Sequence, residues 1–404
     1  MPELHDENVN LLTCPKINAT PDTNAKIAFG DLDGNAIKFL YFLIHEGVLQ
    51  LPAQNYDKLV EIYRTPTTEL TKATLDEFSA IIRDAVVIKP SPKITFIGDD
   101  LADRGMNDLY TLKIFEKLSH GDINFEIITS NHGAQFLKQY AVGLDQENIT
   151  LYTYNNHAYG NSLHNLQTLI KNSATTGVTL DEVDRIMTDI YLPRLKLFSY
   201  EKDNSGELNI YSHAPIDATK IKAVAKLFQV EFNDSTQDKL MQTIDKINQQ
   251  FQLKVFNQDK QFLEDLSVIS QLEILVNDRY GELANNTLKH PENYPQRDYT
   301  VKNIHGHVGT EKPVADVSYS WKYVNLDGNL GKGNNMRDVY HVYTNNANYR
   351  DISNKTEKDI SFDSEKTASA SKQGIFSHTT TVQTVIDNPE PAQSPQVKKP
   401  SSPA

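Results

Sequence analysis

Five short segments of the chain combine carboxylates, amides and imidazoles, the side chains that hold divalent metal ions in proteins. They are Gly30-Asp31-Leu32-Asp33-Gly34-Asn35, Gly98-Asp99-Asp100-Leu101-Ala102-Asp103-Arg104-Gly105, Ser130-Asn131-His132-Gly133, Ser212-His213-Ala214-Pro215 and His305-Gly306-His307. One such segment alone is more often a turn, a cap or a half-buried imidazole. Five in order at strand ends are harder to dismiss, because gathered carboxylates and imidazoles repel and desolvate one another unless cations neutralise them.

Strands are expected directly before these segments. Residues 26–30, 93–97 and 125–129 read as short buried strands, and each is followed by a loop and a helix, including helices at 35–48 and 108–118. Three such units predict an α/β fold. Ligands in such folds gather where the carboxyl ends of the strands meet the loops, and the candidate residues are expected there.

The remaining chain predicts further helices and strands. Helices are expected near 70–85 and over 160–192, a hairpin joins strands at 195–200 and 207–211, and strands resume at 299–304, 319–326 and 339–343. Residues 216–290 read as a helical insertion, in which apolar residues recur at helical spacing: Leu240, Ile244, Ile247 and Phe251. We interpret this stripe as a packing face, with a partner-binding surface as the alternative.

The two ends of the chain differ in composition from the domain between them. Residues 1–24 are polar and are expected to form a loosely held leader, and residues 25–350 form the domain. The segment 364–404 is rich in Ser, Thr and Pro and cannot bury enough apolar surface to fold, so a disordered tail is expected.

Composition excludes several classes of protein. The 404 residues are 39% hydrophobic and 23% charged, as in a soluble globular protein, and the net charge of −13 argues against a nucleic-acid-binding surface. The single cysteine, Cys14, allows no internal disulfide and lacks the phosphate loop of a thiolate phosphatase. The amino terminus has no Sec-type signal, and no run approaches the ~18 apolar residues of a membrane span.

The ordered motifs GDLDGN, GDDLADRG, SNHG, SHAP and HGH resemble those of the calcineurin-like metallophosphoesterases: GDxHG, GDxxDRG, GNHE, a His after a strand, and GH. The Asp-Arg-Gly sequence favours the phosphoprotein phosphatase (PPP) branch. The resemblance covers residues 25–345 outside the insertion. It implies a calcineurin-like fold, with a central β-sandwich flanked by helices, in which the segment Asn325-Leu326-Asp327-Gly328 ends the closing strand.

The same resemblance implies a two-metal phosphatase that hydrolyses phosphate monoesters by attack of a metal-bridging hydroxide. Phosphoproteins, on Ser/Thr or Tyr, are the favoured substrates. The implied metal ligands are Asp31, Asp33, Asp99, Asn131, His213 and His307, with Asp99 bridging both ions. Asp31, Asp33 and His307 would share one ion, and Asn131 and His213 the other.

Three further residues receive roles from the resemblance. His132 would protonate the leaving group, Asp103 would orient that imidazole, and Arg104 would bind the phosphoryl oxygens. His305 would either contact substrate or pack.

Three departures from the family pattern qualify these assignments. Asp33 stands where the family has a His, which favours Mn²⁺ or Mg²⁺, with Fe and Zn²⁺ as alternatives. The second motif has one extra residue, so Asp100 is the reserve for Asp99 as the bridging ligand. Gly133 replaces a supporting Glu but removes no ligand.

Two other functions fit the sequence less well. GDLDGN also resembles the first motif of haloacid-dehalogenase-type phosphatases, in which Asp31 would be the nucleophile and Asp33 the acid/base. That family places its Ser/Thr motif before GDxxxD, whereas Thr129-Ser130 follows it here, and it gives the histidines no role. A non-catalytic binding module would not need Asp103, Arg104 and His132 together.

The polar leader, the helical insertion and the Ser/Thr/Pro-rich tail together resemble phosphatase effectors that Legionella-type bacteria inject into host cells. The resemblance implies a soluble protein that acts in the host cytoplasm, with the tail as translocation signal and the insertion as the site for a host partner. The alternatives are the bacterial cytoplasm and a tail that is a spacer.

Overall fold

The computed structural model describes residues 3–19, 22–146, 153–154, 157–158, 160–266, 269–278, 297–308 and 321–346, all within Met1–Ile352. They form the mixed α/β architecture that the sequence predicts. The expected tail, 364–404, and residues 279–290 of the expected insertion lie outside the described residues. Within these ranges no helix is both long and apolar enough to cross a bilayer.

The larger sheet has six strands. Their order is β1 (Glu3–Asn10), β14 (Arg337–Thr344), β2 (Lys26–Phe29), β5 (Lys93–Phe96), β6 (Phe125–Ile128) and β9 (Leu195–Lys196). The last four strands are parallel, while β14 runs antiparallel to both β2 and β1. The carboxyl ends of β2, β5 and β6 therefore share one edge, as the sequence analysis expected.

The smaller sheet has four strands, in the order β10 (Ser199–Lys202), β11 (Leu208–Tyr211), β12 (Val301–His305) and β13 (Trp321–Asn325). Only β10 is antiparallel to its neighbour. Two short pairs, β3 (Leu49–Gln50) with β4 (Val86–Val87) and β7 (Thr153–Tyr154) with β8 (His157–Ala158), complete the strands. The predicted hairpin forms, but Leu195–Lys196 pairs with β6 in the larger sheet instead of with β11.

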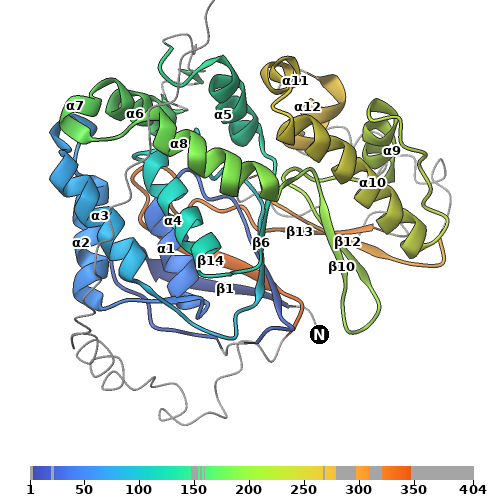
Figure 1. Cartoon of the computed structure of the whole chain (residues 1–404). Coiled ribbons are helices and arrows are strands. Elements are labelled where there is room, and N and C mark those ends of the chain that lie inside the picture. Colours follow the sequence, from blue (N-terminus) through green and yellow to red (C-terminus); the bar gives the residue numbers. More distant parts are fainter. Residues whose placement is uncertain are drawn as a thin grey trace, which may run out of the picture. The chain divides into compact units, whose positions relative to one another are not determined.

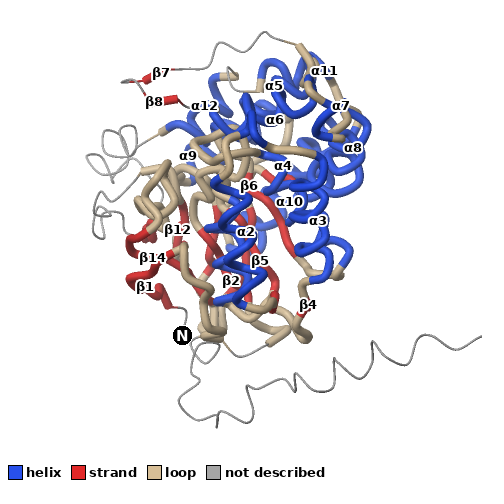
Figure 2. The backbone as a smooth tube through the Cα atoms, turned by 90° about the vertical axis from the view of Figure 1, so that its left-hand side faces the viewer, coloured by secondary structure: helices blue, strands red, loops and turns tan. Residues whose placement is uncertain are grey.

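A layer of helices covers the larger sheet: α1 (Ala36–His45), α2 (Ala53–Arg64), α3 (Lys72–Asp84) and α4 (Asp108–His120). A 3₁₀ turn, η1 (Thr67–Glu69), joins α2 to α3. Figure 2 views this layer from the side of α2, which lies in front of β2 and β5. Every residue of α1 is buried, and Phe42 stacks on Phe29 of β2 with ring centroids 4.2 Å apart. Apolar burial of this kind fixes the start of α1 beside the first candidate loop.

The other helices follow the candidate loops. These helices are α5 (Asn131–Val142), α6 (Asn161–Lys171), α7 (Ser173–Thr176), α8 (Leu180–Ile186), the π turn η2 (Met187–Tyr191) and the 3₁₀ turn η3 (Leu192–Arg194). The insertion contributes α9 (Ala218–Leu227), α10 (Gln237–Phe256), α11 (Lys260–Asp265) and α12 (Ser270–Asn277), grouped beside β10 and β12 in Figure 1. The predicted stripe Leu240, Ile244, Ile247 and Phe251 is buried, as expected of a packing face.

The expectation of a loosely held leader was wrong for Glu3–Asn10. This segment is β1, which pairs with β14 in an unbroken register from Glu3↔Thr344 to Asn10↔Arg337. An edge strand is held chiefly by its backbone hydrogen bonds, so a polar sequence can form one without an apolar face. Only at its end do apolar side chains enter the core, at Val9 and Leu11.

The two sheets contact each other through a small apolar layer. Ala28 of the larger sheet lies in one buried cluster with Tyr211 and Ile304 of the smaller sheet. Hydrogen bonds then connect the loops that leave the strands, including Gly306 N–H to the His213 carbonyl at 2.8 Å. The loops of both sheets thus meet above a common edge.

Candidate metal and phosphate site

The structure brings the five predicted segments to this edge. Asp31 and Asp33 follow β2, Asp99 follows β5, and Asn131 is the first residue of α5 after β6. His213 and His307 follow β11 and β12 of the smaller sheet. Each of these strand–loop junctions is where the sequence analysis placed it.

Backbone hydrogen bonds join the first two loops. Leu32 N–H donates to the Gly98 carbonyl at 3.1 Å, and Gly34 N–H donates to the Asp99 carbonyl at 2.8 Å. The Ser130 hydroxyl accepts from Asp99 N–H and also caps α5 by accepting from Gly133 N–H, both at 2.9 Å. The loops therefore form one connected support for the side chains.

Backbone strain is concentrated here. Of the seven non-glycine residues with positive φ in the described ranges, four are in the candidate loops: Asp33 (56°), Asp99 (49°), Ala102 (57°) and His307 (70°). Each costs roughly 1–2 kcal/mol relative to ordinary backbone. Such conformations persist where the surroundings enforce them, and they cluster at functional sites.

Gly306 allows the loops to approach closely. A Cβ at this position would lie 1.9 Å from Oδ1 of Asp31, so any other residue would displace that carboxylate. Because Gly306 has no side chain, the next residue's N–H can donate to both Asp31 oxygens, at 3.2 and 3.0 Å from His307 N. Asp31 Oδ1 also lies 3.6 Å from Nδ1 of His213.

The donor atoms of Asp99, His213 and His307 lie within 4.8 Å of one another, close enough to share a metal ion. His213 donates from Nδ1 to the Ile97 carbonyl at 2.9 Å, and burial lowers its pKa, so its Nε2 carries a lone pair. This Nε2 lies 2.8 Å from Oδ1 of Asn131 and 3.5 Å from Oδ1 of Asp99. Three acceptor atoms thus face one another.

A divalent cation fits this arrangement. Oδ1 of Asp99 is buried and accepts no hydrogen bond from the described residues. Burial raises the pKa of Asp99, but the neighbouring imidazoles, His213 first, lower it by more. The pKa therefore lies below its usual value, and the carboxylate is ionised. Burial and then the charges of Asp327 and Asp99 hold the pKa of Asp31 well above its usual range. Such crowded carboxylates are favourable only with a cation between them.

His132 and Asp103 form an acid pair beside this cluster. The imidazole donates from Nδ1 to the Ala102 carbonyl at 2.9 Å, and its Nε2 lies 3.6 Å from Oδ1 of Asp103. Both side chains are buried. Burial lowers the pKa of His132, but the charges of Asp103 and Asp99 raise it by more, which favours the protonated form. A proton donor is therefore positioned at Nε2.

Arg104 reaches the mouth of the site. Its Nη1 lies 3.3 Å from Oδ1 of Asp33 and 3.4 Å from Oδ2 of Asp103. The Arg104 side chain is 24% exposed, whereas both carboxylates are fully buried. A guanidinium fixed by buried acids but open to solvent is suited to bind an arriving phosphoryl group.

Asp33 contacts two basic side chains, those of Arg104 and Lys38. Its Oδ2 lies 2.7 Å from Nζ of Lys38, which also donates to the Asp31 carbonyl. Burial raises the pKa of Asp33 to about 6, although Lys38 and then Lys332 oppose that shift. A metal-ligand role for Asp33 therefore stays a prediction, and its observed partners are basic side chains.

The structure distinguishes Asp99 from Asp100 and gives His305 a place. Asp99 lies with the imidazoles, while buried Asp100 faces the Tyr191 hydroxyl of the π turn, and burial raises the pKa of Asp100 to about 7. His305 is buried, donates from Nδ1 to the Gly306 carbonyl at 2.9 Å, and burial lowers its pKa to about 4. Packing is thus the better description of His305.

Sequence reasoning missed two lysines of the site. Lys38 is the one charged residue inside α1 before its final His45, and a lone charge in a fully apolar helix could have signalled a buried partner. Lys332 lies 2.8 Å from Oδ1 of buried Asp327, which the sequence analysis placed at the closing strand without a role. No local spacing connects Lys332 with the first loop.

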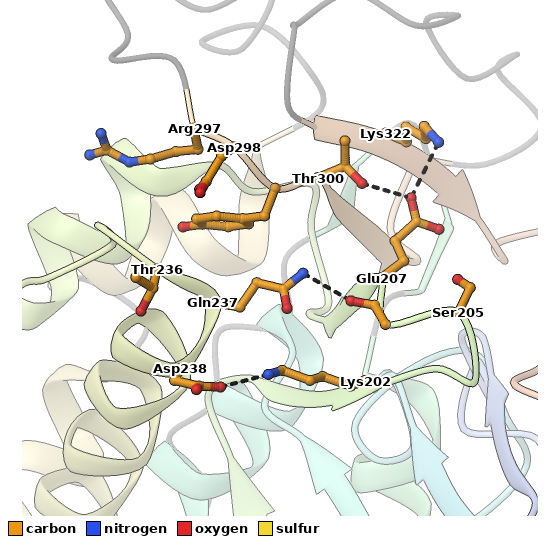
Figure 3. Close-up of a pocket in the computed structure, with 12 residues that line it drawn as sticks. Lys202, Ser205, Glu207, Thr236, Gln237, Asp238, Arg297, Asp298, Thr300 and Lys322 are labelled. Atoms are coloured by element: carbon orange, nitrogen blue, oxygen red, sulfur yellow. Dashed lines mark hydrogen bonds and ion pairs between the residues drawn. The ribbon is translucent and has the colours of Figure 1, made fainter.

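A pocket of about 840 Å³ lies at the amino ends of β11 and β12, away from these loops. Figure 3 shows its acidic and basic side chains facing one another, among them Lys202 with Asp238 at 2.6 Å and Lys322 with Glu207 at 3.2 Å. The described residues that line it include no histidine. Several of its charges are paired with one another, and the candidate site remains the cluster at the carboxyl ends.

Comparisons with known proteins identify a phosphatase domain. A family model described as "WipA-like, phosphatase domain" matches residues 93–332, which include four of the five segments. The crystal structure of the phosphatase domain from the Legionella effector WipB aligns with a TM-score of 0.54 and 25% identity, over 76% of this chain and 99% of that one.

A cold-active protein-tyrosine phosphatase of a psychrophilic Shewanella aligns with a TM-score of 0.36 and 11% identity, over 84% of this chain and 80% of that one. No curated protein matches the sequence.

Proposed function

The chain belongs to the WipA-like phosphatase-domain family, and from that premise we propose that it is a two-metal phosphatase on a calcineurin-like fold. It hydrolyses phosphate monoesters, and phosphoproteins are its favoured substrates. The observation that carries the proposal is the convergence of Asp99, His213 and His307 next to the buried pair His132 and Asp103.

The proposed metal-binding residues are Asp31, Asp99, Asn131, His213 and His307. Oxygen donors balance the imidazoles in this set, which favours Mn²⁺, with Mg²⁺, Fe and Zn²⁺ as alternatives. When bound, such ions acidify a water molecule and neutralise charge on the phosphoryl group. The predicted sixth ligand, Asp33, is considered separately below.

His132 supplies the proton for the leaving oxygen. Its Nδ1 is engaged by the Ala102 carbonyl, so Nε2 is the nitrogen that faces the site. The Asp103 carboxylate, 3.6 Å away, favours the imidazolium form and orients the ring. General acid catalysis of this kind contributes about 10²–10⁴-fold to the rate.

Arg104 binds and orients the phosphoryl oxygens at the mouth of the site. Its planar guanidinium matches the geometry of a phosphate, and its charge offsets the charge that develops in the transition state. Asp33 and Asp103 hold this group from below through Nη1.

The haloacid-dehalogenase alternative fits less well. It requires Asp31 as a nucleophile, but both Asp31 oxygens accept from His307 N–H, and the carboxylate lies beside His213. A trapped aspartyl-phosphate on Asp31 would nevertheless revive it. A non-catalytic module has no use for the buried acid pair.

An effector role is part of the proposal. The support is the similarity to the phosphatase domain of the Legionella effector WipB. We expect action in a host cytoplasm, and a reporter fused to the chain would show whether it is translocated. A reporter retained in the bacterium would contradict this part alone.

The enzyme assignment is tested with a phosphopeptide panel. Wild type, His132→Ala and Asp99→Asn are assayed with Mn²⁺, Mg²⁺, Zn²⁺ or a chelator. We expect metal-dependent release of phosphate that both substitutions abolish or greatly reduce. Turnover that persists in the chelator would eliminate the metal mechanism.

A further inference from the structure

Each carboxylate oxygen of buried Asp33 faces a basic side chain. Oδ2 faces Nζ of Lys38 at 2.7 Å, and Oδ1 faces Nη1 of Arg104 at 3.3 Å. The Asp33 side chain has no exposed surface, and Lys38 is 7% exposed. Both carboxylate oxygens are thus already paired with cations.

Lys38 is placed to serve Asp33. It lies in the first turn of α1, where the Asn35 side chain accepts from its N–H at 3.1 Å. Its ammonium reaches the Asp31 carbonyl and the Asp33 carboxylate within an otherwise apolar helix. Burying a lysine is unfavourable unless an anion compensates it. A divalent ion on Asp33 would place a second positive charge beside that ammonium, and the two would repel.

The turn that carries Asp33 has a defined backbone geometry. Its φ of 56° and the bond from Gly34 N–H to the Asp99 carbonyl fix the turn. Among the described residues, neither Asp33 nor Asp31 belongs to the donor groups formed by Asp99, His213, His307, Asp103 and His132. Asp31, however, lies 3.6 Å from His213, whereas the ion pairs of Asp33 are with Lys38 and Arg104. Asp33 therefore lies at the site without joining its donor clusters.

Arg104 needs such an anchor. Its long side chain is partly exposed, and a flexible guanidinium loses entropy on binding a phosphate. Asp33 and Asp103 contact the same nitrogen, Nη1, from two buried positions. Two fixed contacts on one nitrogen set the direction of the guanidinium before substrate arrives, which is preorganisation.

We propose that Lys38 and Asp33 are positioning residues for Arg104, and that Asp33 orients this arginine toward the phosphoryl group instead of binding a metal ion. The array Lys38–Asp33–Arg104 then replaces the imidazole ligand that the calcineurin-like metallophosphoesterases have at the position of Asp33. The inference rests on the proposed function, since it assumes that Arg104 binds phosphate.

The test measures two kinds of binding by calorimetry: Mn²⁺ to the metal-free full chain, and inorganic phosphate to the Mn²⁺-loaded full chain. The variants are Asp33→Asn, Asp33→His, Lys38→Met and Arg104→Lys. The matched control is Lys113→Met, which removes another largely buried helical lysine, one that pairs with Glu116 at 3.0 Å and Glu182 at 2.6 Å.

We expect the Asp33, Lys38 and Arg104 variants to weaken phosphate binding by about tenfold or more, as for loss of a hydrogen bond to a charged group. The number of Mn²⁺ ions bound should stay at the wild-type value, and the control should bind both ligands normally. The double variant Asp33→Asn/Arg104→Lys should be no worse than Arg104→Lys alone, because the two residues act through one contact.

Other results would overturn the inference. Loss of a Mn²⁺ equivalent in Asp33→Asn, restored in Asp33→His, would make residue 33 a metal ligand. Unchanged phosphate binding in Asp33→Asn would remove the positioning role, and this variant decides the matter if Lys38→Met does not fold. If the wild type binds no Mn²⁺ and hydrolyses no phosphopeptide, the proposed function itself has failed.

Discussion

Two buried charged clusters lie toward opposite ends of the same parallel strands. Toward the amino ends, Glu126 of β6 lies 3.0 Å from Lys26, 3.3 Å from Lys93 and 2.7 Å from Lys196. The hydroxyls of Thr95 and Ser199 donate to the same carboxylate. Toward the carboxyl ends, the acidic side chains are crowded together and several backbones are strained.

The comparison separates a structural cluster from a functional one. The lysines around Glu126 hold its pKa well below the usual range, although burial opposes them, so its charge stabilises the fold. The pKa of Asp31 is shifted in the opposite direction. The charge of Glu126 is compensated by lysines, and its cluster joins the two sheets. The crowded carboxylates at the carboxyl ends are less well compensated, which is typical of a ligand-binding site.

The largest effect on turnover should follow from a substitution in the acidic cluster at the carboxyl ends of the strands. Asp99→Asn removes the carboxylate that faces His213 and His307, and we expect turnover to fall by at least about 10³-fold, since bound cations supply several kcal/mol. Thermal unfolding of the metal-free protein should change little. Turnover and Mn²⁺ binding near wild-type levels would mean that Asp99 is not the central ligand.

A smaller effect is expected from Asp103→Asn. The Asp103 charge raises the pKa of His132, so the variant imidazole should lose its proton at lower pH. Activity that requires the protonated His132 imidazole falls as pH rises. In Asp103→Asn the alkaline limb of the kcat/KM profile should therefore move to lower pH, and activity near neutrality should be roughly tenfold lower. An unmoved alkaline limb would assign that limb to another group.

A substitution in the Glu126 cluster, toward the amino ends of the strands, should lower stability and leave turnover unchanged. Glu126→Gln should lower the free energy of unfolding by about 3 kcal/mol, because it removes the carboxylate charge that faces buried Lys26. The folded-state pKa of Glu126 is depressed, so its contribution is present above the unfolded pKa of ~4.3 and is lost as pH falls. Denaturant titrations of both proteins across acidic pH would show the difference disappear at low pH. A turnover defect in folded Glu126→Gln would break the comparison.

The smallest effect has the opposite sign. Asp31→Asn should raise the stability of the metal-free protein by about 1 kcal/mol, because a crowded charge is removed. The pKa of Asp31 is raised in the folded state. Its contribution to the free energy of unfolding is therefore present below the pKa of the unfolded state and is lost as pH rises through the pKa of the folded state. The gain should therefore grow with pH in chelator. A destabilised variant at neutral pH would show that the carboxylate is satisfied without metal.

Local sequence patterns predicted the strand ends and the residues that follow them. The buried strands, their turn residues and the helix periodicity are short-range signals, and they placed Asp31, Asp99, Asn131, His213 and His307 at one edge. Patterns could not predict side-chain pairings. Lys38 and Asp33 are near in sequence, yet their contact depends on the positive φ of Asp33.

Long-range and polar features were the ones missed. Tyr191 reaches Asp100 through a π turn that no periodicity indicates. The strand Glu3–Asn10 has no apolar alternation to reveal it, and its partner lies more than three hundred residues away. Hydrogen bonding of the backbone, not side-chain burial, decided its structure.

That pairing has a consequence for how the domain is made. In the larger sheet β14 lies between β1 and β2, so a strand synthesised more than three hundred residues after them separates the two. Until residue 344 has left the ribosome, the nascent chain carries open edges on both β1 and β2. We expect pairing at such sequence separation to be slow, and the unpaired edges to make the growing polypeptide prone to aggregation until β14 is complete.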